Sequence, residues 1–481
     1  MKIELKQLDD YRWLIPKTGA MRVPGMLFSN EKLIKSIGND PCLTQVANVA
    51  MLPGIVGHAL AMPDMHWGYG FPIGGVAAFD PHEGIVSPGG VGYDINCGCR
   101  LMTTQLDAND IRPFVTDLVQ GLFRDIPCGV GSSGNIRLSN KEEAQVAVQG
   151  AAWAVKKGLG TAGDLERTED GGTIPGADPS ALSERAMTRG RDQLGTLGSG
   201  NHFLELQVVD HIFDSQKAET FHLFEGQFAV LIHSGSRGFG HQICDDFLKE
   251  MTKRTSTDSR YASLPDRQLI YAPLSSELAN RYLSAMACAA NYAWANRQIL
   301  MHWTQQSIMA TLSLTPREMG MRLVYDVCHN IAKKEVHRVN GSEMMLCVHR
   351  KGATRALPPG HPLLPKEYRH SGQPVLIPGD MGSYSYVLAG THGAVKQSFG
   401  SCCHGAGRVL SRNQAIKKAK GRDIRRELAD SGIVVQSRGK RTLKEEMPEA
   451  YKSVSEVIES VQGAGLANKV ARLRPLGVVK G

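Results

Sequence analysis

The sequence predicts a mixed α/β (α+β) protein, with central β-sheets flanked by helices in a single large interwoven domain spanning residues 1–481. Four short apolar runs predict buried strands, and a stretch at 275–312 without glycine or proline predicts helix. No stretch has the composition of an interdomain linker. A chain of 481 residues could hold about two to four average domains, so the missing linker favours one large domain.

Polar residues follow the four apolar runs at the point where each run ends. The runs are 228–232, 323–328, 344–348 and 375–377, and they are followed by His233, by His329 and Asn330, by His349 and Arg350, and by Pro378, Gly379 and Asp380. Strand ends that open into loops are a common place for ligands in α/β proteins. We therefore expect these four strand ends to converge on one site.

Helices and loops are predicted around these strands. Alanine and valine periodicity at 141–157 predicts a helix, and 275–312 predicts one or two amphipathic helices packed on the sheets. Glycine, threonine, aspartate and proline at 158–179 indicate a loop or an ordered insertion, and four prolines indicate another loop at 355–365.

Charge and cysteine content narrow the class of protein. With 55 basic and 47 acidic residues the net charge is +8, which permits an anionic partner without requiring one. The amino-terminal residues lack the apolar core of a signal peptide, and no run is long enough to span a bilayer. We therefore expect a cytoplasmic protein without membrane contact, whose ten cysteines are reduced thiols. Nothing indicates a coiled coil, and we expect a monomer.

The turn at 401–408 contains a candidate nucleophile. His404 lies between Cys403 and Gly405 in a glycine-rich segment that closes on Arg408. Glycines let backbone N–H groups cradle phosphate oxygens, and an imidazole inside such a cradle could attack phosphorus. The alternative is a glycine-rich turn with a structural histidine. The sequence has neither a G-x-x-x-x-G-K-[ST] phosphate loop nor the Lys-x-Asp-Gly motif of lysine-dependent ligases.

Metal-ligating residue types occur in two further glycine-rich turns. Asp94 and Cys97 are three apart, and His202 follows a double glycine. Together with His233 and His329 they could hold two metal ions if the thiolate bridges, and paired ions suit phosphoryl chemistry. Ligand softness does not choose between zinc and manganese. The alternative interpretation of the 89–100 segment is a tight turn with buried small thiols.

A basic segment follows the candidate nucleophile. Eight basic residues and one acidic residue lie within 408–426, and the wider basic segment extends to 441. This pattern indicates either a solvated helix face or a track for a polyanion. The stretch 408–426 has no aromatic residue, so stacking on bases is not predicted there.

Taken together, these motifs resemble the RtcB family of RNA-splicing ligases over nearly the whole chain, which implies an RtcB-type fold. The matching segments are 62–66, 92–98, 198–203, 233–238, 329–330, 349–355, 378–383, the run around His404, and Lys480. The resemblance implies a GTP- and Mn²⁺-dependent enzyme that joins an RNA 3′-phosphate or 2′,3′-cyclic phosphate to a 5′-hydroxyl, in tRNA splicing or RNA repair. An archease-type activator is implied as a possible partner.

The resemblance also implies roles for individual residues. Asp94, Cys97 and His202 would hold one Mn²⁺, and Cys97, His233 and His329 the second. His404 would accept GMP. The implied GTP site consists of Asn201, His202, Phe203, Leu204, Glu205, His329, Asn330, Pro378, Gly379, Asp380, Met381, Ser385, His404, Gly405, Ala406, Gly407, Tyr451 and Lys480.

Further residues are assigned outside these two sites. Arg237, Arg350 and Lys351 are candidate contacts to RNA phosphates. Cys402 and Cys403 are expected to be scaffolding. Two other functions remain open: a dinuclear metallohydrolase acting on RNA without a nucleotide, and a non-catalytic RNA-binding protein that uses the basic segment.

Overall fold

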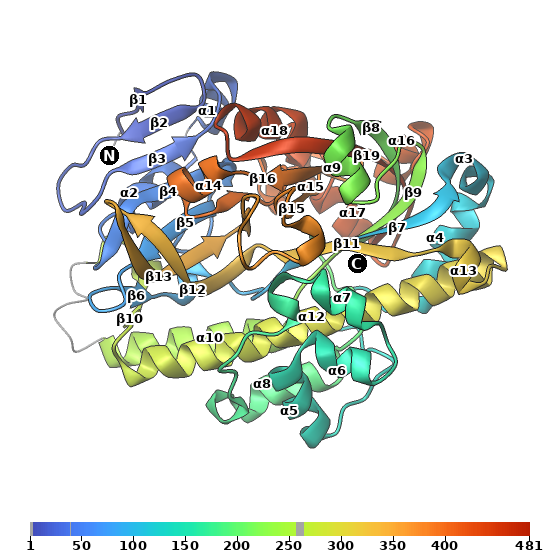
Figure 1. Ribbon diagram of the computed structural model, residues 1–481, viewed down its shortest axis with the longest axis horizontal. Helices are drawn as coiled ribbons and strands as arrows, with labels where there is room; N and C mark the ends of the chain where they lie inside the picture. The colour runs from blue at the N-terminus through green and yellow to red at the C-terminus, as the bar shows by residue number, and fades with distance from the viewer. Residues whose placement is uncertain (1–2, 39, 256–263) are drawn as a thin grey trace.

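The structure is a computed structural model that describes residues 3–38, 40–255 and 264–481 (Figure 1). It is a mixed α/β protein in which two large sheets lie above a pair of long helices. This arrangement confirms the predicted fold class. The strands are mostly antiparallel, and among the described residues only the pairs β3–β4 and β18–β19 run parallel.

The first sheet has seven strands, mainly from the amino-terminal part of the chain. Their order is β1 (Lys6–Gln7), β2 (Arg12–Ile15), β3 (Gly25–Phe28), β4 (Ile55–His66), β5 (Ile73–Phe79), β13 (Ser342–Lys351) and β12 (Asn330–Val339). Of the two strands from the second half of the chain, β13 pairs with β5 and β12 pairs with β13, so segments far apart in the sequence share this sheet.

The second sheet is curled. Its order is β11 (Arg322–Cys328), β7 (Gly98–Asp107), β9 (Gln227–Ser234), β8 (Phe203–Ile212), β19 (Ala467–Lys480), β16 (Ser385–Gly390) and β15 (Pro374–Ile377), with β18 (Val434–Ser437) paired to β19. The end strands β11 and β15 contact each other, which almost closes the sheet into a barrel. Two short ribbons complete the strands: β6 (Ile85–Val86) with β10 (Ala272–Pro273), and β14 (Ala353–Arg355) with β17 (Ser401–Cys403).

All four apolar runs are strands, as predicted. They form the interiors of β9, β11, β13 and β15, where nearly every residue of the predicted run is buried. The ends of β9, β11 and β15 meet at one pocket. The end of β13 does not, because His349 and Arg350 are buried within the first sheet.

The stretch predicted as one or two helices is a single helix, α12 (Glu277–Leu312). Ser276 caps it by accepting a hydrogen bond from the N–H of Ala279, and it ends at Ser313 in the left-handed conformation. Its many alanines let α5 (Asn140–Gln149), α6 (Ala151–Lys156) and α10 (Arg237–Thr255) approach closely, and Trp294 is fully buried as expected. Helix α12 thus lies beneath both sheets beside α10 (Figure 1).

The remaining helices are shorter. They are α1 (Glu31–Ile37), α2 (Cys42–Val49), α3 (Ala108–Ile111), α4 (Val115–Asp125), α5 (Asn140–Gln149), α6 (Ala151–Lys156), α7 (Ala162–Glu166), α8 (Glu184–Arg191), α9 (Ser215–Thr220), α13 (Pro316–Met319), α14 (His392–Ser398), α15 (Arg412–Lys418), α16 (Ile424–Asp430), α17 (Lys440–Glu445) and α18 (Val454–Gly463). Among the described helices, none combines the length and the apolar character that crossing a bilayer requires.

Two predicted segments differ in detail from the structure. The helix expected at 141–157 is interrupted at Gly150, whose φ of 57° breaks it into α5 and α6. The 158–179 segment is an ordered insertion with helical turns, since it contains α7 and a 3₁₀ turn at Glu169–Gly172. The 355–365 segment is a loop after the end of β14.

Candidate active site

A turn before β7 presents Asp94 and Cys97 to the interior. Asn96 lies between them with a φ of 54°, and the N–H of Cys97 donates to the carbonyl of Asp94 at 3.0 Å. The end of β11 is fastened to this turn, because the N–H of His329 donates to the carbonyl of Cys97 at 2.9 Å. The turn and the strand end therefore hold their side chains in fixed relation.

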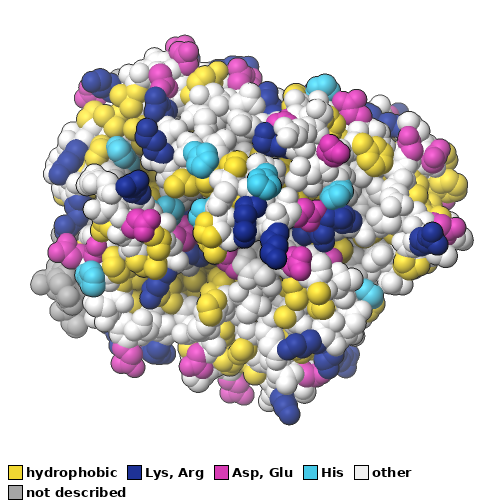
Figure 2. All heavy atoms as spheres, in the orientation of Figure 1, with side chains coloured by type: hydrophobic (Ala, Val, Ile, Leu, Met, Phe, Trp, Pro, Cys, Tyr) yellow, Lys and Arg dark blue, Asp and Glu magenta, His cyan; other side chains and the backbone are white. Residues whose placement is uncertain are grey.

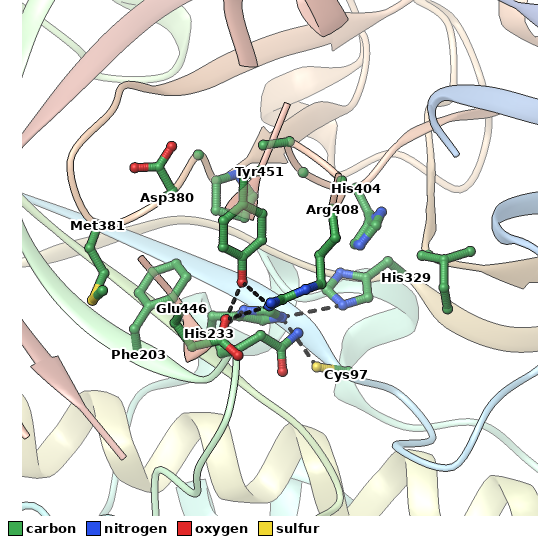
Figure 3. A pocket seen from close by; sticks show the side chains of 18 of the residues that line it. Cys97, Phe203, His233, His329, Asp380, Met381, His404, Arg408, Glu446 and Tyr451 are labelled. Atoms are coloured by element: carbon green, nitrogen blue, oxygen red, sulfur yellow. Dashed lines mark hydrogen bonds and ion pairs between the residues drawn. The ribbon is translucent and has the colours of Figure 1, made fainter. Parts of the chain in front are cut away.

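Five candidate metal ligands, Cys97 among them, lie close together, and Figure 3 shows three of these, Cys97, His233 and His329. Sγ of Cys97 lies 3.3 Å from Nε2 of His202 and 3.2 Å from Nε2 of His233. Nε2 of His233 lies 3.3 Å from Nε2 of His329, and Nε2 of His202 lies 2.8 Å from Oδ2 of Asp94. The donors form two sets that share Cys97, one with Asp94 and His202 and one with His233 and His329.

The chemistry of this cluster fits a cation. Burial lowers the pKa of all three histidines, which keeps the imidazoles in the neutral form that binds metals. Burial and the neighbouring Asp94 charge raise the pKa of the Cys97 thiol, so a thiolate here requires a cation beside it. The other ring nitrogen of His233 faces the carbonyl of Asn201 at 3.2 Å, which leaves Nε2 free for a ligand.

A buried arginine supports the cluster from beneath. Arg297 of α12 donates to the carbonyls of Asn96 at 2.7 Å and Ser234 at 3.0 Å, which adjoin Cys97 and His233. Its guanidinium also pairs with Asp326 at 2.8 Å, and Asp326 pairs with Arg100 at the same distance. The network holds together two of the segments that carry metal-ligand candidates.

His404 follows β17 and faces the same pocket. Its Nδ1 lies 2.6 Å from Oδ2 of Asp64, a fully buried residue of β4, and its own N–H donates to the same oxygen at 3.0 Å. Burial raises the pKa of Asp64, but His404 and Lys452 outweigh that effect and hold this pKa below its usual range. An ionised Asp64 keeps the proton on Nδ1 and leaves Nε2 of His404 as a nucleophile. The ring centres of His404 and His329 are 4.9 Å apart.

One cavity of about 270 Å³ joins the donor cluster to His404 (Figure 3). Most residues of the predicted sites line it: Asp94, Cys97, Asn201, Phe203, Glu205, His233, His329, Asn330, Pro378, Gly379, Asp380, Met381, His404, Gly405, Ala406, Gly407, Tyr451 and Lys480. The structure therefore brings these residues, from eight separate parts of the sequence, together around one cavity.

Glu205, Glu446 and Lys480 are buried ionisable side chains of this cavity. Burial raises the pKa of Glu205 to about 8 against the opposing effect of Lys480, and burial lowers the pKa of Lys480. Arg408 contacts Glu446 at 3.2 Å and lies over the ring of Tyr451 at 5.0 Å. These side chains form a polar recess with both donors and acceptors.

Three residues of the predicted sites do not line this cavity. Leu204 points to the opposite face of β8 and packs in the apolar core with Met102, because side chains alternate along a strand. Ser385 is buried behind the wall, where its hydroxyl accepts a hydrogen bond from Gln207 at 3.0 Å. His202 does not line the cavity itself, and it reaches the donor cluster through Nε2 of its ring.

The predicted RNA contacts Arg350 and Lys351 are wrong. Arg350 is 1% exposed and pairs with Glu335 at 2.8 Å, so its guanidinium is already occupied. The ammonium of Lys351 is buried and donates to the carbonyls of Phe71 and Gly89. Arg237 is half-buried, with Nη1 3.0 Å from Nδ1 of His202. Cys402 and Cys403 are buried in β17, which agrees with a scaffolding role.

Several residues of this site have no role that the sequence alone predicts. Asp64 lies in the quoted 62–66 segment, but nothing in the sequence pairs it with a histidine 340 residues away. Arg408, Arg412 and Glu446 line the cavity, and the first two were treated only as part of the basic segment. Arg297 gave no signal, since it is one of several polar residues of α12 and nothing in the sequence sets it apart from the others.

Comparison with known proteins agrees with this geometry. The family described as tRNA-splicing ligase RtcB matches residues 45–481. The chain is 52% identical to the tRNA-splicing ligase RtcB of Thermococcus kodakarensis, over 100% of this chain and 99% of that protein. It is 50% identical to the tRNA-splicing ligase RtcB of Archaeoglobus fulgidus, over 99% of each chain. It is 53% identical to the RNA-splicing ligase RtcB of Mycobacterium bovis, over 91% of this chain and 100% of that protein.

Matches of this extent define the class of protein: the chain is an enzyme, and its class is the ligases. More particularly, it belongs to the RtcB family.

Proposed function

We propose that this RNA ligase joins an RNA 3′-phosphate or 2′,3′-cyclic phosphate to a 5′-hydroxyl, with GTP as co-substrate and two Mn²⁺ ions as cofactors. Family membership supports RNA ligation and tRNA splicing. The observation that carries the finer proposal is the position of His404, which shares one cavity with two metal-ligand sets.

The two ligand sets suit two Mn²⁺ ions with Cys97 as the bridge. Asp94 and His202 would complete one set, and His233 and His329 the other. The carboxylate and imidazoles fit manganese, and the buried thiol requires a cation beside it to ionise. Two bound ions would supply charge neutralisation and polarisation at the triphosphate.

The buried recess suits guanine. The guanine base carries a hydrogen-bond acceptor at O6 and a donor at its N2 amino group. Glu205 offers an acceptor for the amino group, and Lys480 offers a donor for O6. Adenine presents a donor where guanine presents O6, and it would face the Lys480 ammonium unfavourably. This arrangement favours GTP over ATP.

Covalent transfer follows from the hydrogen bond between Asp64 and His404. Nε2 of His404 attacks the α-phosphorus, a P–N bond forms, and the bond to pyrophosphate breaks. Asp64 holds the proton on Nδ1 and stabilises the charge that develops on the ring. The turn at Gly405 and Gly407 lets the backbone approach the phosphate, and Gly407 has a φ of 71°.

Ligation then uses the transferred GMP as a leaving group. A 2′,3′-cyclic end is first hydrolysed by one water to the 3′-phosphate. An oxygen of the RNA 3′-phosphate attacks the histidine-bound phosphorus, so the P–N bond breaks and an anhydride forms. The 5′-hydroxyl attacks the 3′-phosphorus, loses its proton and displaces GMP, which leaves a phosphodiester bond between the strands.

Labelled GTP tests the proposal directly. Full-length protein incubated with Mn²⁺ and GTP labelled at the α-phosphate should carry an acid-labile label on a denaturing gel. His404→Ala should abolish the label, and the exposed control His392→Ala should retain it. Unlabelled, metal-loaded protein that still cleaves RNA phosphates, with activity kept in His404→Ala, would instead identify a metallohydrolase.

A further inference from the structure

A second cavity lies beside the catalytic one and is built from the basic segment. It has a volume of about 340 Å³ and lies between α16 and α17. Seven residues line it: Arg422, Asp423, Ile424, Arg425, Lys440, Leu443 and Lys444. Four of them are basic and one is acidic, so the cavity attracts anions.

The basic side chains of this cavity are free to take a ligand. Arg425, Lys440 and Lys444 make no side-chain hydrogen bond or ion pair with any residue that the structure describes. Arg422 differs from them, because it pairs with Glu427 and Glu449. On the face in Figure 2, by contrast, many basic side chains lie close to acidic ones. The second cavity thus combines three basic side chains that have no partner among the described residues.

Helix α17 connects this cavity to the active site. Lys440, Leu443 and Lys444 lie on one face of it, at the spacing of successive helical turns. Glu446, directly after the helix, lines the catalytic cavity and lies 3.8 Å from Arg412. Six residues of helix rise about 9 Å, the rise of about three stacked nucleotides.

Helix α15 extends the same surface. Its first residue, Arg412, lines the catalytic cavity, and the helix packs against α17. Lys417 and Lys418 at its other end are exposed. Exposed basic residues thus lie on the helix that reaches from the mouth of the active site and packs against α17.

We propose that the cavity between α16 and α17 binds the phosphodiester backbone of the RNA substrate a few nucleotides from its reacting end. The inference rests on the proposed RNA ligation, and it adds a substrate-binding surface to that reaction. No aromatic residue lines the cavity, so the contact is to phosphates and does not depend on base sequence.

The proposal is tested by measuring how binding depends on the length of an RNA strand. Full-length protein without GTP is titrated with fluorescent 3′-phosphate and 5′-hydroxyl oligoribonucleotides of about 2 and about 12 nucleotides. Lys440→Glu with Lys444→Glu should weaken binding of at least one long strand about tenfold or more. It should lower the slope of log K against log salt by about 1.4, the value for two lost contacts to a single strand. Binding of the short strands should be unchanged.

A matched variant separates a local contact from net charge. Lys141→Glu with Arg317→Glu makes the same charge change at exposed positions on α5 and α13. Equal weakening by both double variants would overturn the proposal, and so would unchanged long-strand binding in Lys440→Glu with Lys444→Glu. The latter result would be the one expected if an acidic protein used this cavity.

The labelled-GTP reaction keeps this test apart from the proposed function. Both double variants should form the histidine adduct at the wild-type rate, which also shows that they fold. If wild-type protein forms no adduct, the proposed function fails. If the adduct forms but strand length has no effect on binding, only the second cavity's role fails.

Discussion

Charged residues are prominent both in the buried network beneath the donor cluster and on the exposed basic surface of α15–α17. In the buried network the charges are paired, whereas several cations of the basic surface are not. Arg100, Arg297 and Asp326 are fully buried, and each cation pairs with the carboxylate at 2.8 Å. On the basic surface, Arg425, Lys440 and Lys444 have no partner among the described residues.

The difference reflects the cost of removing a charge from water. A buried ion needs a partner of opposite charge and full hydrogen bonding, so its position is fixed by its neighbours. An exposed ion is screened by water and salt, and it acts through the field it contributes. The buried network can therefore hold the catalytic groups in place, while the basic surface can attract a polyanion.

Loss of the shared sulfur should have the largest effect. Cys97→Ala should abolish binding of both Mn²⁺ ions, because each ligand set includes this residue. Cys99→Ala is the matched control, since Cys99 is equally buried but packs in the apolar core. Metal content per chain, measured after dialysis, checks this. One ion at full occupancy in Cys97→Ala would rule out the bridge.

Loss of the Asp64 charge beside His404 should have the second-largest effect. Asp64→Asn removes the charge that holds the proton on Nδ1 of His404, and the rate of adduct formation should fall at least about 10²-fold. Single-turnover labelling with GTP measures that rate. Asp214→Asn, in a helix cap far along the chain, should keep it. A rate within threefold of wild type would show that Asp64 does not orient the ring.

Breaking the buried network should cost stability. Arg297→Met leaves Asp326 with one cation and the carbonyls of Asn96 and Ser234 without their donor. The free energy of unfolding should fall by about 3–5 kcal/mol. Urea unfolding of metal-free protein measures this quantity. A loss below about 1 kcal/mol would mean that the network does not hold these segments together.

An exposed pair should have the smallest effect. Lys35 and Glu31 lie one turn apart on α1, and their side chains are 72% and 61% exposed. Lys35→Ala should change the free energy of unfolding by less than about 0.5 kcal/mol in the same urea experiment. A change as large as that of Arg297→Met would remove the contrast between buried and exposed charges.

Much of the fold could be predicted because the signals are local. The interiors of β9, β11, β13 and β15 are continuous apolar runs, and α12 has no glycine or proline across its length. Gly150 was the exception, since its effect on the 141–157 helix depends on a backbone angle that a sequence does not display.

Site residues could be predicted where metal-ligating or nucleophilic side chains lie beside glycines in the sequence. They were missed where the role of a side chain depends on contact with a residue that is distant in the sequence. Leu204 was included because neighbouring residues match a motif, although alternate side chains of β8 face opposite ways. Arg350 was predicted to contact RNA phosphates, because the sequence does not show that Glu335 of the neighbouring strand β12 already pairs with it. Asp64 could not be assigned, since its role exists only after β4 and the turn beyond β17 meet.

That meeting has a consequence for biogenesis. Asp64 and His404 are 340 residues apart, so their hydrogen bond forms only after most of the polypeptide has emerged and both sheets have assembled. A nascent or partly folded chain has an imidazole without its orienting carboxylate. On the proposed function, such a chain would react poorly with nucleotides, so the rate of nucleotide transfer would report completed folding.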